Sequence, residues 1–114
     1  MIAVIFELEP KPDQKQKYFE LAADLKPLLS DIDGFISIER FQSLANDKKF
    51  LSLSFWRDET AVKAWRNCGE HRQAQQQGRD SIFKHYRLRV AEIQRDYSML
   101  DREQVPTDTQ ASLI

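Results

Sequence analysis

Residues 54–79, with the sequence SFWRDETAVKAWRNCGEHRQAQQQGR, bring together two tryptophans, a histidine, the single cysteine and four glutamines. His71 can accept a proton near neutral pH, because the reference pKa of histidine is about 6.5. Trp65 can stack on a flat molecule and donate a hydrogen bond from its indole nitrogen. Gln75 lies one helical turn after His71, where its amide can hydrogen-bond an oxygen atom of the same molecule. Two further candidates for substrate contact follow this segment, Phe83 and Tyr86.

Each of these candidates also has a purely structural interpretation. Trp65 lies on an apolar stripe, where a large aromatic side chain usually supplies packing. His71 follows Glu70 near a helix start, where a solvated or capping histidine is common. The glutamines that begin at Gln75 can form a polar helix surface. Cys68 is read more readily as a small buried hydrophobic residue than as a nucleophile.

Composition limits the classes of function. A chain of 114 residues forms a single domain, and 41% apolar with 31% charged residues is ordinary for a globular protein. A net charge of −1 gives no reason to expect a nucleic-acid partner. The start, MIAVIFELEP, resembles neither a signal peptide nor a membrane span, so we expect a cytoplasmic protein without a membrane partner. One cysteine and two distant histidines provide no metal motif.

The pattern of apolar residues predicts the first half of the fold. Residues 2–9 alternate as a strand, and helical spacing follows from residue 13 to residue 32. Pro27 lies inside that helix, so we expect a kink or a fresh turn there. Gly34 can end the helix in the left-handed conformation. Residues 35–44 and 50–56 then form two strands joined by a short polar link, which is typical of an antiparallel hairpin.

The second half repeats this order. Asp58 can cap a short helix, Gly69 is expected to break it, and a second helical piece follows. Residues 85–97 alternate as a last strand, with the long side chains of Arg87 and Arg89 on one side, where they are solvated or pair with acidic residues across a dimer.

The order strand, helix, strand, strand, broken helix, strand predicts an α+β fold of the ferredoxin-like βαββαβ type. Its four-stranded antiparallel sheet carries both helices on one face. The helix side of the sheet cannot hold all of a set of large apolar side chains, so a homodimer that buries sheet against sheet is expected. These residues are Phe35, Phe41, Phe50, Trp56 and Ile93.

The element order, the segments SFW, RDETAVKAW and EHRQAQQQGR, and the strand YRLRVAEIQRDY resemble the antibiotic biosynthesis monooxygenase domain of the dimeric α+β barrel superfamily. The resemblance covers residues 1–98 and leaves residues 99–114 as a C-terminal tail. It implies a homodimer with a small cavity between sheet and helices in each subunit. Some members of the family oxygenate phenols or quinols without metal or flavin, because the substrate anion itself passes an electron to dioxygen.

Other members degrade heme, which an asparagine on the first strand, a tryptophan on the second helix and a later histidine hold. Trp65 matches that tryptophan by its place in the helix. The first strand contains no asparagine, and the position ten residues past Trp65 is Gln75 rather than histidine. These two departures argue against heme degradation.

The sequence thus predicts a cofactor-independent monooxygenase that acts on a small aromatic phenol or quinol with dioxygen. His71 is the expected base, Trp65 a second catalytic residue, and Gln75, Tyr86 and Phe83 the substrate contacts. Two alternatives stay open: a non-catalytic or stress-related protein that binds a small ligand, and a heme-binding protein that uses His71.

Overall fold

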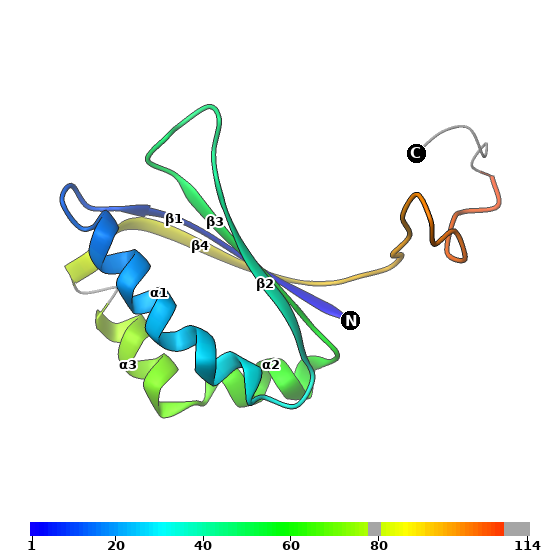
Figure 1. The fold of residues 1–114 in the computed structure, drawn as a ribbon, viewed down its shortest axis with the longest axis horizontal. Coiled ribbons are helices and arrows are strands. Elements are labelled where there is room, and N and C mark those ends of the chain that lie inside the picture. Colours follow the sequence, from blue (N-terminus) through cyan, green and yellow to red (C-terminus); the bar gives the residue numbers. More distant parts are fainter. Residues whose placement is uncertain (78–80, 109–114) are drawn as a thin grey trace.

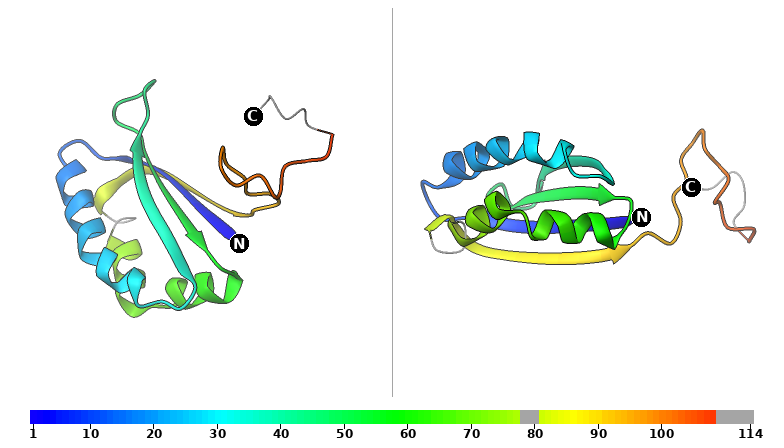
Figure 2. Two further views of the ribbon diagram at one scale, coloured as in Figure 1. Left: turned by 45° about the vertical axis from the view of Figure 1, so that its right-hand side comes forward. Right: turned by 90° about the horizontal axis from the view of Figure 1, so that it is seen from below.

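The fold is a four-stranded antiparallel sheet with three helices on one side, as Figures 1 and 2 show. It was obtained as a computed structural model, and the structure describes residues 1–77 and 81–108. The elements are β1 (Ile2–Pro10), α1 (Lys15–Ser30), β2 (Phe35–Gln42), β3 (Phe50–Trp56), α2 (Glu59–Arg66), α3 (Gly69–Gln77) and β4 (Phe83–Glu92). The strand order is β2-β3-β1-β4. The predicted ferredoxin-like α+β fold of the single chain is therefore confirmed.

Asp58 caps its helix as predicted, whereas α1 ends at Ser30 with Asp31 as its C-cap, before Gly34. The Oδ1 atom of Asp58 accepts a hydrogen bond of 3.0 Å from the backbone N–H of Ala61, which caps α2. Gly34 has a φ of +94°, and an added Cβ there would lie 2.8 Å from the Cβ of Ala61. The helical segment breaks at Asn67 and Cys68, and α3 begins at Gly69.

Helix α1 and strand β4 differ most from the expectation, and β1 and β2 end within two residues of their predicted ends. Helix α1 continues through Pro27 to Ser30 without a new helix starting there. Pro27 is exposed, as is Ala23 one turn earlier, so water can replace the backbone hydrogen bond that proline cannot make. Strand β4 begins at Phe83 and ends at Glu92, because beyond Glu92 the chain runs past the end of β1, its only neighbour in the sheet, and leaves the sheet (Figure 1).

We call the side of the sheet that meets the helices the inner face and the opposite side the outer face. The register across β3, β1 and β4 places apolar side chains at the centre of the outer face. These are Ala3, Ile5, Leu51, Leu53 and Phe55. Phe41 pairs with Leu51 and is 43% exposed, whereas Phe35, Phe50 and Trp56 pack on the inner face. The inner face therefore holds three of the large side chains, and Phe41 lies outside.

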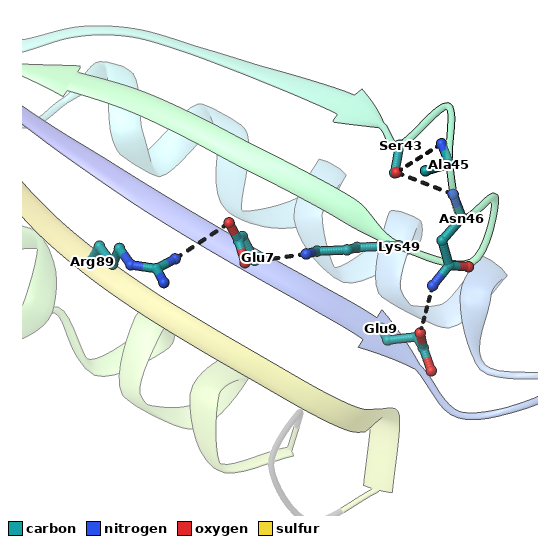
Figure 3. A network of polar contacts seen from close by, with 7 residues as sticks. All are labelled: Glu7, Glu9, Ser43, Ala45, Asn46, Lys49 and Arg89. Atoms are coloured by element: carbon teal, nitrogen blue, oxygen red, sulfur yellow. Dashed lines mark hydrogen bonds and ion pairs between the residues drawn. The ribbon is translucent and has the colours of Figure 1, made fainter.

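Charged side chains lie next to this apolar centre in the strand register, and Figure 3 shows their contacts. Glu7 pairs with Arg89 at 3.3 Å and with Lys49 at 3.4 Å, and Glu9 accepts a hydrogen bond of 3.1 Å from Asn46. Arg89 therefore pairs with an acidic residue of its own chain. None of the helices in the described part of the chain is both long and apolar enough to span a membrane.

Candidate functional site

The interior of the domain is divided into two core clusters. One contains Leu8, Tyr18, Phe50 and Ile82, near the start of α1. The other contains Leu29, Trp56, Ala61 and Val62, near the end of α1 and along α2. A cavity of about 190 Å³, lined by residues of all four strands and all three helices, is bordered by members of both clusters. That volume is slightly larger than an engineered cavity of about 150 Å³ that binds benzene.

The cavity exists because β3 places two small side chains between two large ones on the inner face. Phe50, Ser52, Ser54 and Trp56 all point inward, and all four are buried. The two serines fill little of the space beneath the helices, while Phe50 and Trp56 reach into the two clusters on either side. The hollow therefore lies above the serines.

The strand register defines the floor of the cavity as two rows of side chains. In the first row, Arg40 of β2 lies beside Ser52, followed by Phe6 of β1 and Leu88 of β4. The second row, one residue pair along the sheet, consists of Ile38, Ser54, Val4 and Val90. Leu88 and Val90 line the cavity and are about half exposed, so the cavity opens beside β4.

His71 and Trp65 form one wall of this cavity. Their rings stack with centroids 4.3 Å apart and an interplanar angle of 14°. The Nδ1 atom of His71 lies 3.0 Å from the backbone carbonyl oxygen of Trp65. A carbonyl can only accept, so Nδ1 carries the proton and Nε2 of the neutral ring keeps its lone pair.

The environment of His71 favours the neutral ring. Burial lowers the pKa of His71 below its usual value, and the hydrogen bond to the carbonyl of Trp65 opposes this only in part. The imidazole at neutral pH is thus a proton acceptor through Nε2, as a general base requires.

The indole of Trp65 stacks with two other rings. His71 covers one of its faces, and the indole of Trp56 lies 6.4 Å away at an angle of 27°. Trp56 is 1% exposed and donates from Nε1 to Ser54 Oγ at 2.9 Å. Trp65 is thus a packing residue that also forms part of the cavity wall.

The other predicted contacts have different outcomes. Phe83 lines the cavity. Tyr86 packs against Phe83 and Phe6 with ring centroids 5.7 Å from each, but it is 44% exposed and does not line the cavity. Gln75 belongs to α3, and its side chain lies outside the described residues. The structure therefore brings together His71, Trp65 and Phe83.

Polar residues of the cavity lining that were missed in the sequence are Tyr18 and Arg40, along with Arg66, Ser52 and Ser54. Tyr18 of α1 is buried, and its hydroxyl accepts a hydrogen bond of 3.3 Å from Nε of Arg40. Burial raises the pKa of Tyr18, while the positive charge of Arg40 acts in the opposite direction. Tyr18 falls on the apolar stripe of its helix, where its hydroxyl gives no separate signal. The inward direction of Arg40 had no signal of its own, since β2 shifts register between Phe35 and Ser37.

No group of three or more histidine, cysteine, aspartate or glutamate side chains suited to a metal ion occurs within residues 1–77 and 81–108. The cavity wall consists mainly of carbon, with the polar atoms of Arg40, Tyr18, Arg66, His71 and the two serines around it. This arrangement can hold a small apolar molecule and accept a proton from it.

Comparison with known proteins identifies relatives. The family model described as antibiotic biosynthesis monooxygenase matches residues 1–77. A Pyricularia oryzae protein named jasmonate monooxygenase ABM is 46% identical over 93 residues, which cover 82% of this chain and 43% of that protein. The chain thus spans less than half the length of that relative. The uncharacterized protein YqjZ of Bacillus subtilis is 31% identical over 93 residues, covering 82% of this chain and 79% of that protein.

Solved structures share the fold. A crystal structure from Deinococcus radiodurans has a TM-score of 0.77 at 13% identity and covers 88% of this chain and 99% of that one. The structure of Rv0793 from Mycobacterium tuberculosis has a TM-score of 0.76 at 18% identity and covers 85% and 98%. The family match, which covers most of the chain, and the two relatives above confirm the resemblance seen in the sequence: the chain belongs to the antibiotic biosynthesis monooxygenase family.

Proposed function

We propose that the chain is a monooxygenase that transfers one oxygen atom of dioxygen to a small phenol- or quinol-type molecule held in the cavity, without a metal or an organic cofactor. Membership of the family and the name of the Pyricularia oryzae relative support the monooxygenase class. The observation that carries the proposal is a neutral histidine in the wall of an apolar cavity.

The proposed reaction needs few protein groups. Dioxygen is a triplet and reacts slowly with a closed-shell molecule until that molecule becomes an electron-rich anion. His71 Nε2 takes the proton of the phenol hydroxyl, and the phenolate gives one electron to dioxygen. The resulting radical pair combines to form a carbon–oxygen bond. Loss of water from this peroxide leaves a quinone, so one oxygen atom enters the product and the other leaves as water.

The remaining side chains bind and orient. Phe83, Phe6 and Val4 exclude water from the reacting ring, which strengthens every electrostatic interaction in the cavity. Trp65 holds the imidazole of His71 in position by stacking. Gln75 stays a predicted contact to a quinone oxygen.

The test is oxygen consumption with a panel of naphthols, quinols and jasmonate, the last because it appears in the name of the Pyricularia oryzae relative. His71→Asn keeps an N–H donor for the carbonyl of Trp65 but removes the base, so we expect turnover to fall by about 100-fold or more. His85→Asn is the matched control, because His85 is exposed on β4 and does not line this cavity.

Full activity of His71→Asn would remove the assigned base. A small molecule that stays bound through purification, with no oxygen uptake on any member of the panel, would favour the non-catalytic binding protein instead.

We further propose that two copies pair through their outer faces. The apolar centre around Leu53, bordered by Glu7, Arg89 and Lys49 (Figure 3), has the composition of an interface with a charged rim. Leu53→Glu places a carboxylate beside Ile5 and Glu39 at this centre. We expect it to weaken the dimer by about 100-fold.

Leu44→Glu is the control, because Leu44 lies outside the strands and is fully exposed. Sedimentation velocity over a dilution series separates the variants. A wild-type protein that sediments as a single chain at high concentration would contradict the pairing.

A further inference from the structure

Arg40 brings a positive charge into a mainly apolar cavity whose lining also includes Arg66. Its side chain lines the cavity floor from β2, in the row that continues through Ser52 and Phe6. No carboxylate belongs to the cavity lining in the part of the chain that the structure describes. Glu39, its neighbour in sequence, is one residue out of phase on β2 and therefore points to the outer face.

Arg66 and Arg57 form ion pairs with carboxylates, whereas Arg40 does not within the described residues. Arg66, which also lines the cavity, pairs with Glu59 at 3.6 Å. Arg57 pairs with Asp33 and Asp58. Among residues 1–77 and 81–108, the polar contact of Arg40 is the bond from its Nε to the Tyr18 hydroxyl. The N–H groups on the two Nη atoms of Arg40 therefore have no acidic partner there.

Tyr18 completes a site for an anion. Its hydroxyl oxygen accepts from Arg40, so its own hydrogen is available for donation. Burial keeps this hydroxyl protonated, because it raises the pKa of Tyr18. A guanidinium with free N–H groups next to an O–H donor matches the two oxygens of a carboxylate, which arginine recognises in a bidentate manner.

We propose that Arg40 and Tyr18 bind the carboxylate of an organic acid whose compact apolar body occupies the cavity. Arg40 on β2 is two strands away from Phe6 on β1, which corresponds to about 10 Å at the usual strand spacing. This width and a volume of about 190 Å³ fit one ring with a short chain. The other end of the ligand lies toward Trp65 and His71. The inference rests on the proposed function only in that the phenol- or quinol-type substrate proposed there would also carry this carboxylate.

The test measures binding alone, with a matched series of ligands. 4-Ethylbenzoate, its primary amide and its methyl ester have nearly the same shape, and only the first carries a charge. Quenching of the fluorescence of Trp65 and Trp56, the two tryptophans of the cavity lining, reports binding. We expect the acid to bind about tenfold or more tightly than the amide and the ester, as for a hydrogen-bonded ionic contact.

Three variants test whether the preference for the acid over the amide and the ester arises from Arg40 and Tyr18. Arg40→Gln removes the charge, and we expect it to abolish the preference for the acid. Arg66→Gln removes the other arginine of the lining, which already has an acidic partner, and is expected to keep the preference. Tyr18→Phe is expected to reduce it several-fold. Circular dichroism melting shows whether each variant is folded, and the ligand comparison on the wild-type protein needs no variant at all.

Equal binding of acid, amide and ester by the wild-type protein would overturn the inference, as would no measurable binding of the acid at millimolar concentration. A preference that survives in folded Arg40→Gln would also overturn it. The proposed function fails separately: a phenolic acid that binds through Arg40 without any oxygen uptake would leave the carboxylate site intact and would remove the catalysis. Oxidation of uncharged phenols by a protein that shows no preference for acids would support the proposed function and would overturn the carboxylate site.

Discussion

Replacing Ser52 by valine should stabilise the protein while it reduces the cavity. Ser52 is buried on the inner face of β3, and no hydrogen bond to its hydroxyl occurs among the described residues. Valine replaces the hydroxyl by a methyl group and adds a second methyl group, both toward the hollow, and burial of each carbon group contributes about 0.8 kcal/mol. Valine also suits a strand. We therefore expect a gain of roughly 1.5 kcal/mol in the free energy of unfolding, together with weaker binding of any ligand.

Ser54→Val is the matched control one row away. It gains the same methyl groups but loses the acceptor for Nε1 of Trp56, a residue that is 1% exposed. An unpaired buried N–H costs about 1–3 kcal/mol. The free energy of unfolding of Ser54→Val should therefore lie about 1–3 kcal/mol below that of Ser52→Val. Urea unfolding of both variants, followed by circular dichroism, measures this difference.

The result that would refute the reasoning is a destabilised Ser52→Val. Extra methyl groups in a well-packed interior cost about 1–3 kcal/mol, so a loss of this size would mean that no hollow exists above Ser52. Equal shifts for the two variants would mean that the bond between Trp56 and Ser54 contributes nothing.

Three further predictions concern other parts of the chain. The pKa of His71 is lowered in the folded state. The contribution of His71 to the free energy of unfolding is therefore fully present above about pH 6.5 and is lost as the pH falls through the folded pKa. Urea unfolding at a series of pH values should show this loss in the wild-type protein and not in His71→Asn. Gly34→Ala should lower the free energy of unfolding by more than about 1 kcal/mol, because φ is +94° and the new Cβ would lie 2.8 Å from Ala61; thermal melting checks this, and an unchanged melting temperature would contradict it. Added hemin should give no shifted Soret band. A cavity of about 190 Å³ is near the size that holds one benzene ring and is too small for a porphyrin. A Soret shift that disappears in His71→Asn would support the heme-binding alternative instead.

The order of elements could be predicted because each signal is local. The cap at Asp58, the left-handed Gly34 and the break before Gly69 depend only on neighbouring residues. The alternation within β3 also places Phe50 and Trp56 on the same face as the two serines. The end of β4 could not be predicted, since it depends on where the paired strand β1 stops.

The cavity and its charged end depend on relations between strands. The alternation in β3 does not reveal which of its faces the helices cover, so the hollow above Ser52 and Ser54 had no sequence signal. Arg40 faces inward only in the register that follows the shift between Phe35 and Ser37. His71 could be singled out because histidine is a residue type that often accepts protons. Its stacking on Trp65 could not be predicted, because it depends on the turn between α2 and α3.

The most direct test of the account is a crystal structure of the protein under xenon pressure, since an apolar cavity of this size takes up xenon without any specific ligand. The account predicts a xenon atom above Ser52 and Ser54, between α1 and the wall made by Trp65 and His71. A cavity region filled by side chains, with no xenon bound there, would contradict it.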